Sequence, residues 1–474
     1  MQIPDKVTYI IDTLQKNGHE AFAVGGCVRD TVLGRMPEDW DITTSARPEE
    51  IKACFRRTID TGIQHGTVTV MLDKEGFEVT TYRIDGEYED MRHPKQVQFT
   101  RNLKADLERR DFTINAMAYN PSTGIVDIFS GMEDIEKGVI RCVGDAGQRF
   151  DEDALRMLRA VRFSGQLGFA IEEKTAKAIR KRVKNLALVS SERIRVEMDK
   201  LLMSGGADRI RDIYKLGLSD VFLPELKPMM ETEQKNYHHI YSVGEHTIKA
   251  IQIMNSFFGE APESEIPGNI LEEVRRQTVV MDKRTRSILC WTMLLHDVAK
   301  PACFTEDENG TAHFYGHPEK GEKMAKEILR RLTFDNYRTD MICRLIRFHD
   351  YHCEPNKKAV RRAMSKIGAD ILPCFFLVVK ADTLAQNPET FTEKLERLRI
   401  IENYYREIME AGECLQIRDL AVDGNDLIKA GIQPGREIGA ALQMLLDYIL
   451  ENPQDNKKEI LLEQVKKYIN RQNK

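Results

Sequence analysis

The sequence predicts a multidomain protein in which a small α+β domain is followed by a long, mostly helical region. Its 474 residues are about three times the ~150 residues of a typical domain. Residues 1–135 alternate between helix-like and strand-like patterns, whereas the patterns from about residue 150 onward are helical. A composition of 42% hydrophobic and 31% charged residues is typical of globular proteins and excludes disordered, collagen-like and coiled-coil chains.

The expected elements of the first domain follow in order along the chain. An amphipathic helix is predicted at the start from Val7, Ile10, Ile11 and Leu14, and the apolar run at residues 21–24 predicts a strand that ends at Gly25-Gly26. Residues 65–72 and 77–83 are rich in β-branched side chains and are separated by Asp-Lys-Glu-Gly, which predicts a hairpin.

The helical half divides less clearly, because helical patterns follow one another from about residue 150. Residues 255–286 are acidic and polar and predict a loop-rich insertion. We expect an α+β head at residues 1–138, a helical neck at 139–232, a histidine-rich helical domain at 233–390 and a helical tail at 391–474.

Charge, hydropathy and cysteine usage exclude several classes of protein. The net charge of −5 means that any nucleic-acid surface must be a local basic patch. No apolar run reaches the ~18 residues of a membrane helix, and no signal-peptide pattern is visible. The nine cysteines form no CxxC pair, which disfavours a zinc finger or a disulfide framework. We therefore expect a cytoplasmic protein that binds no membrane.

Two aspartates follow the glycine turn. Gly25-Gly26 lies between an expected strand and a helical stretch, where free backbone amides favour phosphate. Asp39 and Asp41 are two residues apart, so on a strand both carboxylates project from the same face. Converging carboxylates repel each other unless a cation lies between them, and Mg²⁺ fits where substrate phosphates supply further ligands. The alternative is a solvated aspartate pair in a turn.

These residues carry a family resemblance. GGCVRD (25–30) followed by DWD (39–41) resembles the head domain shared by tRNA nucleotidyltransferases and bacterial poly(A) polymerases. Further segments occur in the order known for that family: TGIQHGTVTVML (61–72), residues 80–99, RRDFTINAMAYN (109–120), DEDALRMLRAVRF (151–163) and SSERIRVEMDKLL (190–202).

The resemblance implies transfer of a nucleotide from an NTP to an RNA 3′-hydroxyl, with Asp39 and Asp41 holding Mg²⁺. It implies that Asp153 and Arg156, three residues apart on a predicted helix, read the base edges of CTP and ATP without a template. It also implies that residues 83–99 help to switch the specificity from C to A. The implied nucleotide-binding residues are Gly25, Gly26, Arg29, Arg109, Arg110, Asp111, Asp153, Arg156, Arg159 and Arg162. Structural alternatives remain open: Arg29 pairing with Asp30, and simple ion pairing of Asp153 with Arg156.

A basic run follows the expected head. No acidic residue interrupts residues 174–184, and Lys177, Lys181 and Lys184 would align on a helix. Such a run is usually a solvated surface. Beside a head that must hold RNA, it predicts a track for tRNA phosphates. Residues 421–450 resemble the C-terminal part of CCA-adding enzymes, which implies that the helical tail at 391–474 also binds tRNA.

A second constellation lies in the histidine-rich region. Its candidate ligands are His246, His296, Asp297, His317, His349 and Asp382. This order resembles the binuclear form of the HD metal-dependent phosphohydrolases, which implies a transition metal (Ni, Mn, Fe or Zn) and water-dependent cleavage of a phosphoester such as a damaged RNA 3′ end. His238, His239, His313 and His352 do not fit the pattern.

The leading hypothesis is a tRNA nucleotidyltransferase that adds or repairs the 3′-terminal CCA, with tRNA, CTP and ATP as partners and a fused HD phosphohydrolase domain. Three partial activities of the same fold stay open: an A-adding enzyme, a CC-adding enzyme and a poly(A) polymerase. A different class, an HD phosphohydrolase whose head only docks RNA, is the other alternative. The sequence predicts no oligomeric state.

Overall fold

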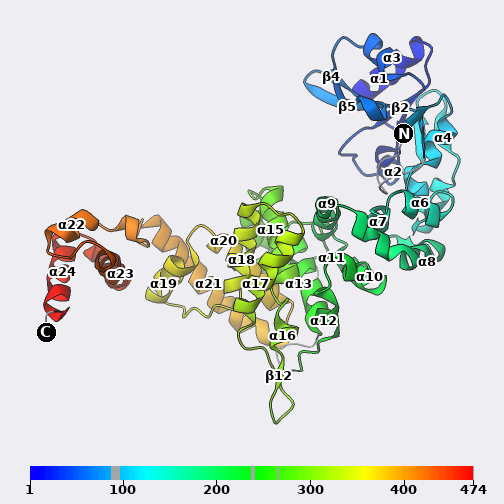
Figure 1. Ribbon diagram of the computed structural model, residues 1–474. Coiled ribbons are helices and arrows are strands. Elements are labelled where there is room, and N and C mark those ends of the chain that lie inside the picture. The colour runs from blue at the N-terminus through cyan, green and yellow to red at the C-terminus, as the bar shows by residue number, and fades with distance from the viewer. Residues whose placement is uncertain (87–96, 236–240, 264–265, 473–474) are drawn as a thin grey trace. The chain divides into compact units, whose positions relative to one another are not determined.

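A mixed β-sheet forms the centre of the N-terminal region (Figure 1). The computed structural model describes residues 1–86, 97–235, 241–263 and 266–472. In this part of the chain the sheet has the order β3-β4-β5-β2-β1-β8-β9. The strands are β1 (Ala21–Val24), β2 (Ile42–Thr44), β3 (Thr58–Gly62), β4 (Thr67–Leu72), β5 (Glu75–Thr81), β8 (Met117–Asn120) and β9 (Gly124–Asp127).

The opening helix is confirmed as α1 (Asp5–Lys16), and all four apolar positions predicted for it are buried. They pack with Ala21, Ile42 and Val79 of the sheet in one apolar core. The hairpin of β4 and β5 is also confirmed, but its turn is shorter than the predicted four residues. Only Asp73 and Lys74 lie between the strands, both with positive φ (48° and 72°), because such turns match the right-handed twist of the paired strands.

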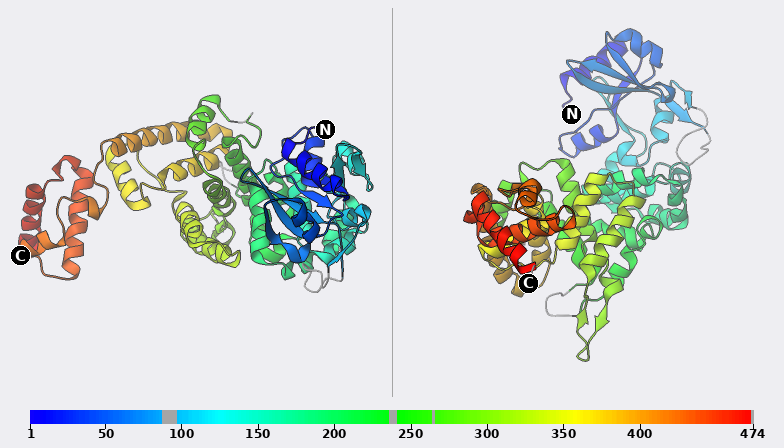
Figure 2. Two further views of the ribbon diagram at one scale, coloured as in Figure 1. Left: turned by 90° about the horizontal axis from the view of Figure 1, so that it is seen from above. Right: turned by 60° about the vertical axis from the view of Figure 1, so that its left-hand side comes forward.

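The rest of the head consists of short elements around the sheet, shown from further sides in Figure 2. The helices are α2 (Gly26–Val32), α3 (Pro48–Cys54), α4 (Leu103–Glu108) and α5 (Gly131–Lys137). Three smaller strand pairs, partly outside the head, are β6 (Arg83–Asp85) with β7 (Val97–Phe99), β10 (Val139–Ile140) with β11 (Ala170–Ile171), and β12 (Thr305–Glu306) with β13 (Ala312–His313). Residues 87–96, the greater part of the predicted specificity-switching segment, lie outside the described residues.

Helices follow the head, and the chain divides into two compact units. Unit 1 is Met1–Lys227 with Arg331–Thr333, and unit 2 is Pro228–Arg330 with Phe334–Lys474. The division lies close to the boundary expected at residue 232, whereas the four-domain division stays a prediction. The helices after the head in unit 1 are α6 (Ala146–Glu152), α7 (Arg156–Leu167), α8 (Glu173–Arg182), α9 (Ser191–Leu202), α10 (Ile210–Lys215) and α11 (Ser219–Phe222), and α12 (Leu226–Glu231) crosses the boundary.

Unit 2 is built from longer helices. They are α13 (Val243–Phe257), α14 (Gly268–Thr278), α15 (Lys283–Leu295), α16 (Lys300–Cys303), α17 (His317–Arg331), α18 (Asn336–Phe348), α19 (Lys357–Ile367), α20 (Leu372–Leu384), α21 (Pro388–Glu410), α22 (Gly424–Lys429), α23 (Arg436–Glu451) and α24 (Lys458–Gln472). The loop-rich insertion expected at residues 255–286 was wrong in part. Leu271, Val274 and Thr278 of α14 are buried at helical spacing, so one apolar stripe stabilises a helix inside the polar sequence.

A buried ion pair joins α20 to α21. Lys380 donates to both carboxylate oxygens of Glu402 at 2.7 and 2.9 Å, and both residues are buried. Burial raises the pKa of Glu402, and Lys380 opposes that rise. Glu273 of α14 lies farther from the Lys380 ammonium, at 4.0 Å.

Replacing Glu402 with alanine should lower the free energy of unfolding of the chain by about 3 kcal/mol, because it leaves a buried ammonium without its close partner. Chemical denaturation followed by circular dichroism measures this change. Glu396→Ala, on the exposed side of the same helix, is the matched control and should change the stability by less than about 0.5 kcal/mol. Equal effects of both variants would contradict the interpretation.

Candidate active site and candidate metal centre

The glycine turn of the head has the predicted place between a strand and a helix. β1 ends at Val24, and α2 starts at Gly26. Gly25 has φ of +84°, and a Cβ atom there would lie 2.9 Å from the Arg110 guanidinium. Only glycine fits this position without strain, because both the backbone angle and the close arginine exclude a side chain.

Asp39 and Asp41 lie directly before β2, not on the strand as predicted. Asp41 still continues the pairing with β1, because its carbonyl oxygen accepts a hydrogen bond from the Val24 amide at 3.0 Å. Both carboxylates are exposed. They therefore lie at the end of two central strands, next to the glycine turn.

A third carboxylate, which the sequence analysis missed, belongs to this group. β2 and β5 are parallel, with Ile42 opposite Val79, so the preceding residues Asp41 and Glu78 lie side by side. Limited hydration raises the pKa of Glu78, and the charges of Asp41 and Asp39 raise it further. Glu78 is hard to recognise as a ligand from the sequence, because a charged residue is ordinary at a solvent-facing position of a strand in which buried and exposed residues alternate.

The charges around Asp41 suit a divalent cation. The surrounding protein raises the pKa of Asp41 by limiting its hydration, Arg110 lowers it and Asp39 raises it again. The negative charges of Asp39 and Asp41 raise the pKa of Glu78, so a cation held by the three carboxylates would relieve their repulsion. Oxygen donors of this kind fit Mg²⁺, so the donor set agrees with the metal that the sequence predicted.

The predicted nucleotide-binding arginines already have protein partners. Arg29 donates to both oxygens of Asp30 at 2.9 Å and to Asn115 at 2.6 Å, so the pairing left open for Arg29 is present. Arg109 and Arg110 both contact Asp106 of α4, a fully buried carboxylate that the sequence analysis did not single out. Burial would raise the pKa of Asp106, but the two arginines outweigh it and lower the pKa.

Asp111 is the centre of a further network. Its carboxylate accepts hydrogen bonds from the Asn115 amide at 3.0 Å and from Arg159 at 2.8 Å. Arg159 outweighs the effect of burial and holds the pKa of Asp111 well below its usual range. A charged acceptor is therefore present at a position where the resemblance implies nucleotide binding, although Asn115 and Arg159 already contact it.

Asp153 and Arg156 do not share a helix, which corrects the sequence prediction. Asp153 lies in the turn after α6, and Arg156 is the first residue of α7. The helix ends there because the Asp153 carboxylate accepts a hydrogen bond from the Leu155 amide at 3.1 Å. Such a local bond competes with the hydrogen bonds of a helix. Arg193 of α9 donates to Asp153 at 2.8 Å, and Arg156 donates to Glu152 at 2.6 Å.

The remaining two arginines of the predicted set brace the neck helices. Arg162 of α7 donates to Glu197 of α9 at 2.5 Å, and both side chains are buried. Arg159 lies 3.8 Å from the same carboxylate. Glu197 therefore joins α9 to α7.

The basic run forms one wall of a cleft in unit 1. Lys174, Lys177 and Lys181 of α8 line a cavity of about 610 Å³ together with Arg141 and Arg182. Lys184 lies beyond the end of α8 in the 3₁₀ turn Val183–Leu188, so the predicted alignment of Lys177, Lys181 and Lys184 on one helix is wrong. All three lysines are exposed, and the RNA-binding role stays a prediction.

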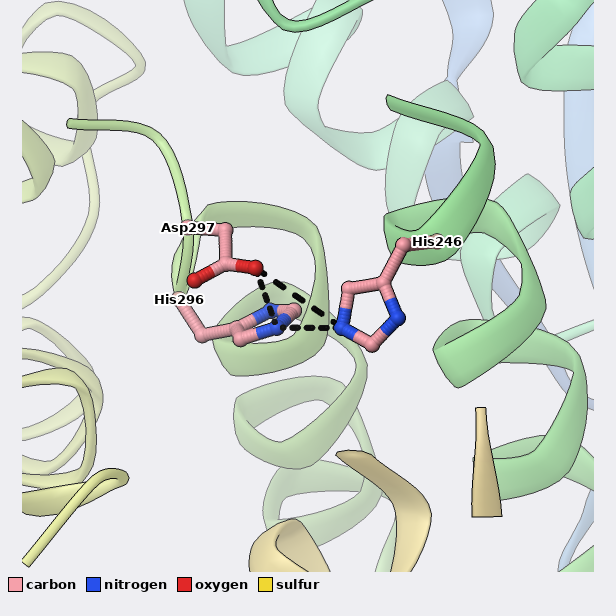
Figure 3. Close-up of side chains that lie close together, drawn as sticks. All are labelled: His246, His296 and Asp297. Atoms are coloured by element: carbon pink, nitrogen blue, oxygen red, sulfur yellow. Dashed lines mark hydrogen bonds and ion pairs between the residues drawn. The ribbon is translucent and has the colours of Figure 1, made fainter. Parts of the chain in front are cut away.

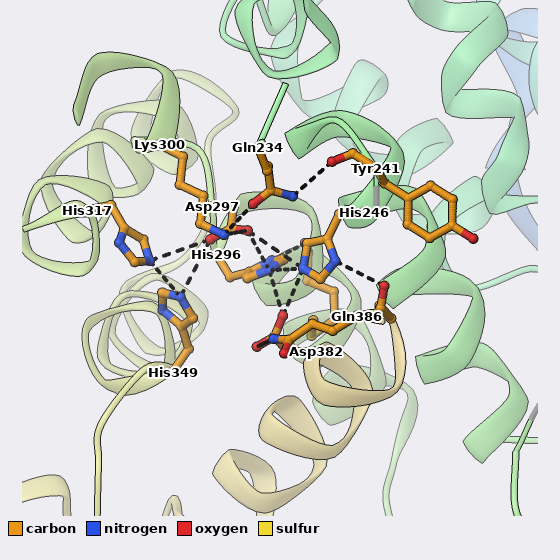
Figure 4. A network of polar contacts seen from close by, with 12 residues as sticks. Gln234, Tyr241, His246, His296, Asp297, Lys300, His317, His349, Asp382 and Gln386 are labelled. Atoms are coloured by element: carbon orange, nitrogen blue, oxygen red, sulfur yellow. Dashed lines mark hydrogen bonds and ion pairs between the residues drawn. The ribbon is translucent and has the colours of Figure 1, made fainter. Parts of the chain in front are cut away.

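The second constellation is brought together inside unit 2. Among the described residues, two groups have metal-ligating atoms within 4.8 Å of one another: His246, His296 and Asp297 (Figure 3), and Asp297, His317 and His349. The sixth predicted ligand, Asp382, lies 2.8 Å from Nε2 of His246 and 3.5 Å from Nε2 of His296 (Figure 4). Two helices, α13 and α20, and the ends of α15, α17 and α18 supply these side chains.

Hydrogen bonds from the backbone fix the histidine rings. Nδ1 of His296, His317 and His349 lies 2.8, 2.9 and 2.7 Å from the carbonyl oxygen three residues earlier. A ring that donates from Nδ1 leaves Nε2 as the free acceptor, which is the usual second contact of a metal-binding histidine. The Nε2 atoms of each pair converge: 3.3 Å for His246 and His296, and 3.2 Å for His317 and His349.

Asp297 connects the two halves of this cluster. Its Oδ2 lies 3.3 Å from Nε2 of His296, and its Oδ1 lies 3.6 Å from Nε2 of both His317 and His349. Burial disfavours its charge, yet His296 and Lys300 lower the pKa of Asp297 well below its usual value. Both carboxylate oxygens are buried, and Oδ2 also lies 2.8 Å from the Lys300 ammonium. Buried imidazole and carboxylate donors that converge in this way fit a pair of transition-metal ions.

Two residues around the cluster were missed. Lys300 is buried, contacts Oδ2 of Asp297 at 2.8 Å and donates to Gln234 at 2.9 Å. Gln386 donates to Oδ2 of Asp382 at 3.1 Å. Neither side chain fits the ligand pattern of the sequence, so only the fold identifies them. Of the histidines left out, His238 and His239 lie outside the described residues, and His352 is exposed.

Comparison with protein families matches three parts of the chain. Residues 21–141 match the poly A polymerase head domain, residues 168–230 match the "Probable RNA and SrmB-binding site of polymerase A", and residues 304–465 match domain 2 of tRNA nucleotidyltransferase. No helix among the described residues is long and apolar enough to cross a membrane.

Curated relatives match less than half of the chain. The CCA-adding enzyme of Lactiplantibacillus plantarum is 54% identical over 194 residues, 41% of this chain and 48% of the relative. That of Leuconostoc mesenteroides is 54% identical over 200 residues, 42% of this chain and 50% of the relative. The matched region thus spans about half the length of these relatives.

Solved structures match the whole chain. The Bacillus stearothermophilus CCA-adding enzyme in complex with CTP has a TM-score of 0.69 and 27% identity, covering 100% of this chain and 99% of that one. The Thermotoga maritima CCA-adding enzyme complexed with tRNA has a TM-score of 0.55 and 19% identity, covering 98% and 96%, which shows the fold alone. The predicted fold class, a multidomain chain with an N-terminal nucleotidyltransferase head and a mostly helical remainder, is confirmed.

Proposed function

We propose that this chain belongs to the CCA-adding tRNA nucleotidyltransferases and that it adds or repairs the 3′-terminal CCA of tRNA with CTP and ATP. The observation that carries the proposal is the group of Asp39, Asp41 and Glu78 beside the Gly25-Gly26 turn. It lies inside residues 21–141, which match the poly A polymerase head domain. A CCA-adding enzyme is 54% identical to this chain over 194 residues.

In this proposal the RNA 3′-hydroxyl attacks the α-phosphate of the bound NTP, and pyrophosphate leaves. Asp39, Asp41 and Glu78 would hold Mg²⁺, which when bound neutralises charge on the phosphates. The Gly25 turn lets the backbone approach the triphosphate, and the Arg110 guanidinium lies close to this turn and acts on the charge of Asp41. The protein therefore contributes positioning and charge compensation, the main requirements of phosphoryl transfer.

Selection of the base is assigned to Asp153 and Arg156. The Asp153 carboxylate accepts from Arg193 and from the Leu155 amide, and the Arg156 guanidinium donates to Glu152. A carboxylate offers acceptors and a guanidinium offers donors in a fixed geometry. Arg156 also donates to the carbonyl oxygens of Arg109 and Arg149, at 2.9 and 3.1 Å. These contacts fix the plane of the Arg156 guanidinium. In this proposal Asp153 therefore offers acceptors, and Arg156 offers donors, to the edge of a base in a constant geometry.

Replacing Asp153 or Arg156 with alanine should relax base choice more than it lowers turnover. One lost bidentate contact is worth about 1–3 kcal/mol, so discrimination of CTP and ATP against UTP and GTP should fall roughly 5- to 150-fold. Incorporation of each labelled NTP into tRNA lacking its 3′ end measures the ratio. Arg180→Ala, at an exposed position of α8, is the control and should keep base choice. Strict selection in both variants would place the reading residues elsewhere.

The same assay separates the remaining activities of this fold. Ordered extension by C, C and A supports the proposal. Addition of A alone, of C alone or of long A tracts would instead identify an A-adding enzyme, a CC-adding enzyme or a poly(A) polymerase.

A second function, metal-dependent hydrolysis of phosphoesters, is proposed for the histidine cluster of unit 2. The favouring observation is the pair of buried, converging donor groups that share Asp297. His246, His296, Asp297 and Asp382 would hold one transition metal, and Asp297, His317 and His349 a second. A metal pair at such a site lowers the pKa of water and stabilises charge on the phosphate. Lys300 and Gln386 orient Asp297 and Asp382 through their own contacts.

A further inference from the structure

Two aromatic rings line the cleft beside the histidine cluster. The cleft has a volume of about 350 Å³ and is lined by Asp297, Lys300, His317, His349 and Asp382 of the cluster, and by His313 and Tyr315. The rings of His313 and Tyr315 are stacked with centroids 5.3 Å apart and an angle of 8° between their planes. Tyr315 is 78% exposed, which is unusual for a large aromatic side chain that already has a stacking partner.

The chain holds this pair in a fixed geometry. Nε2 of His313 lies 2.9 Å from Asp307, and its Nδ1 lies 3.3 Å from the Tyr315 hydroxyl. Asp307 and the Tyr315 hydroxyl thus contact both ring nitrogens of His313. His313 is also paired with Thr305 across the β12–β13 hairpin, which projects from the helices of unit 2 (Figures 1 and 2).

The same segment is tied to the metal-ligating histidines. Phe314, between the two stacked residues, places its carbonyl oxygen 2.9 Å from Nδ1 of His317. Gly316, with φ of +74°, turns the chain between Tyr315 and His317. The aromatic pair and a cluster histidine are therefore parts of one short, hydrogen-bonded segment, and they lie on the same cleft.

We propose that the His313–Tyr315 pair is a stacking platform for a nucleobase, so that the cleft takes phosphoesters of nucleosides, free or at an RNA terminus. An exposed aromatic ring backed by a second ring is a typical surface for an unpaired base. In a nucleoside 2′- or 3′-phosphoester one ribose separates base from phosphate, which suits a cleft with rings and metal-ligating groups on its walls.

This inference rests on the proposed phosphohydrolase function. With a 2′,3′-cyclic phosphate as substrate, one water molecule adds across a P–O bond. The water oxygen bonds to phosphorus, its proton passes to the released ribose oxygen, and the product is a phosphomonoester beside a free hydroxyl. No oxidant, reductant or other co-reactant is needed.

The test compares the Mn²⁺-loaded wild-type chain with Tyr315→Ala and Tyr315→Phe. Three substrates are used: 2′,3′-cyclic AMP, an RNA oligonucleotide with a 2′,3′-cyclic end, and base-free glycerol 1,2-cyclic phosphate. For Tyr315→Ala we expect KM to rise about 5- to 100-fold for the two base-containing substrates, with kcat changed little. KM for the base-free substrate should change less than twofold, and Tyr315→Phe should keep most of the affinity because it keeps the ring.

Direct binding gives a readout that does not need turnover. The Kd of 3′-AMP, measured by isothermal titration calorimetry, should rise by a similar factor in Tyr315→Ala. Tyr337→Ala, which removes an exposed tyrosine of α18, is the matched control and should leave the Kd unchanged. Elemental analysis should show the same metal content in all variants, which excludes loss of the fold as the cause.

The outcomes separate this inference from the function on which it rests. Hydrolysis of all three substrates without dependence on Tyr315 would overturn the platform but support the phosphohydrolase. Tyr315-dependent binding of 3′-AMP without hydrolysis of any substrate would support the platform and overturn the phosphohydrolase. A lower KM for the oligonucleotide than for cyclic AMP identifies an RNA terminus as the source of the nucleoside, and the reverse order identifies free nucleotides.

Discussion

Replacing Asp39 or Asp41 with alanine should abolish incorporation of both CTP and ATP, while tRNA binding stays largely intact. The two carboxylates lie beside the glycine turn and raise the pKa of neighbouring Glu78. They therefore supply the negative charge that Mg²⁺ would neutralise. Metal stabilisation of the transition state is worth several kcal/mol, which corresponds to a loss of at least about 10³-fold in rate. Single-turnover extension of tRNA lacking its 3′ end measures the rate, and filter binding measures the affinity for tRNA.

Two further variants make this experiment specific. Glu78→Gln should give a smaller loss of rate, because Asp39 and Asp41 remain to hold Mg²⁺. Asp60→Ala, which removes an exposed carboxylate from β3 of the same sheet, should keep the wild-type rate. Wild-type incorporation by a chain lacking both Asp39 and Asp41 would refute the assignment.

Changing His296 and Asp297 to alanine should remove metal binding and phosphoester hydrolysis, while nucleotide addition is kept. Asp297 has one oxygen near His296 and the other near His317 and His349, so its loss affects both proposed metal positions. Elemental analysis after loading with Ni²⁺ or Mn²⁺ should show almost no bound metal. Turnover of 2′,3′-cyclic nucleotides should fall by at least about 10³-fold.

Single variants resolve the two halves of the cluster. His246→Ala should reduce the metal content at the position near Asp382 only, and His317→Ala at the other position only. His352→Ala, at an exposed histidine outside the cluster, should keep the metal and the hydrolysis. If the wild-type chain binds no Ni²⁺, Mn²⁺ or Zn²⁺ in the cluster and hydrolyses no phosphoester, the cluster is a structural network. The proposed metal-dependent hydrolysis is then refuted.

The ligands of the histidine cluster were predictable because their chemistry marks them. Few residue types bind transition metals, and six histidine or aspartate residues follow one another from His246 to Asp382 in an order known from a metal-binding family. The fold brings all six together. Lys300 and Tyr315 were not predictable in the same way. A lysine and a tyrosine have many roles, and their place at the cleft depends on how α16 and the segment before α17 turn.

The head gives the same contrast at shorter range. The helix with Val7 and Leu14, the strand before Gly25 and the hairpin around Asp73 were visible in the sequence, because local periodicity and turn residues determine them. The helix through Asp153 was predicted wrongly, because a side chain that bonds to its own backbone favours a turn that periodicity does not reveal.

The sequence by itself determined most of the element types, the order of the motifs and the chemical groups available for catalysis and metal binding. Only the tertiary structure decided which groups meet: Glu78 with Asp41 through parallel pairing of β5 and β2, and Arg193 with Asp153 through packing in the neck. The physical reason is that local conformation depends on neighbouring residues, whereas contacts between distant residues depend on strand register and helix packing, which are properties of the whole fold.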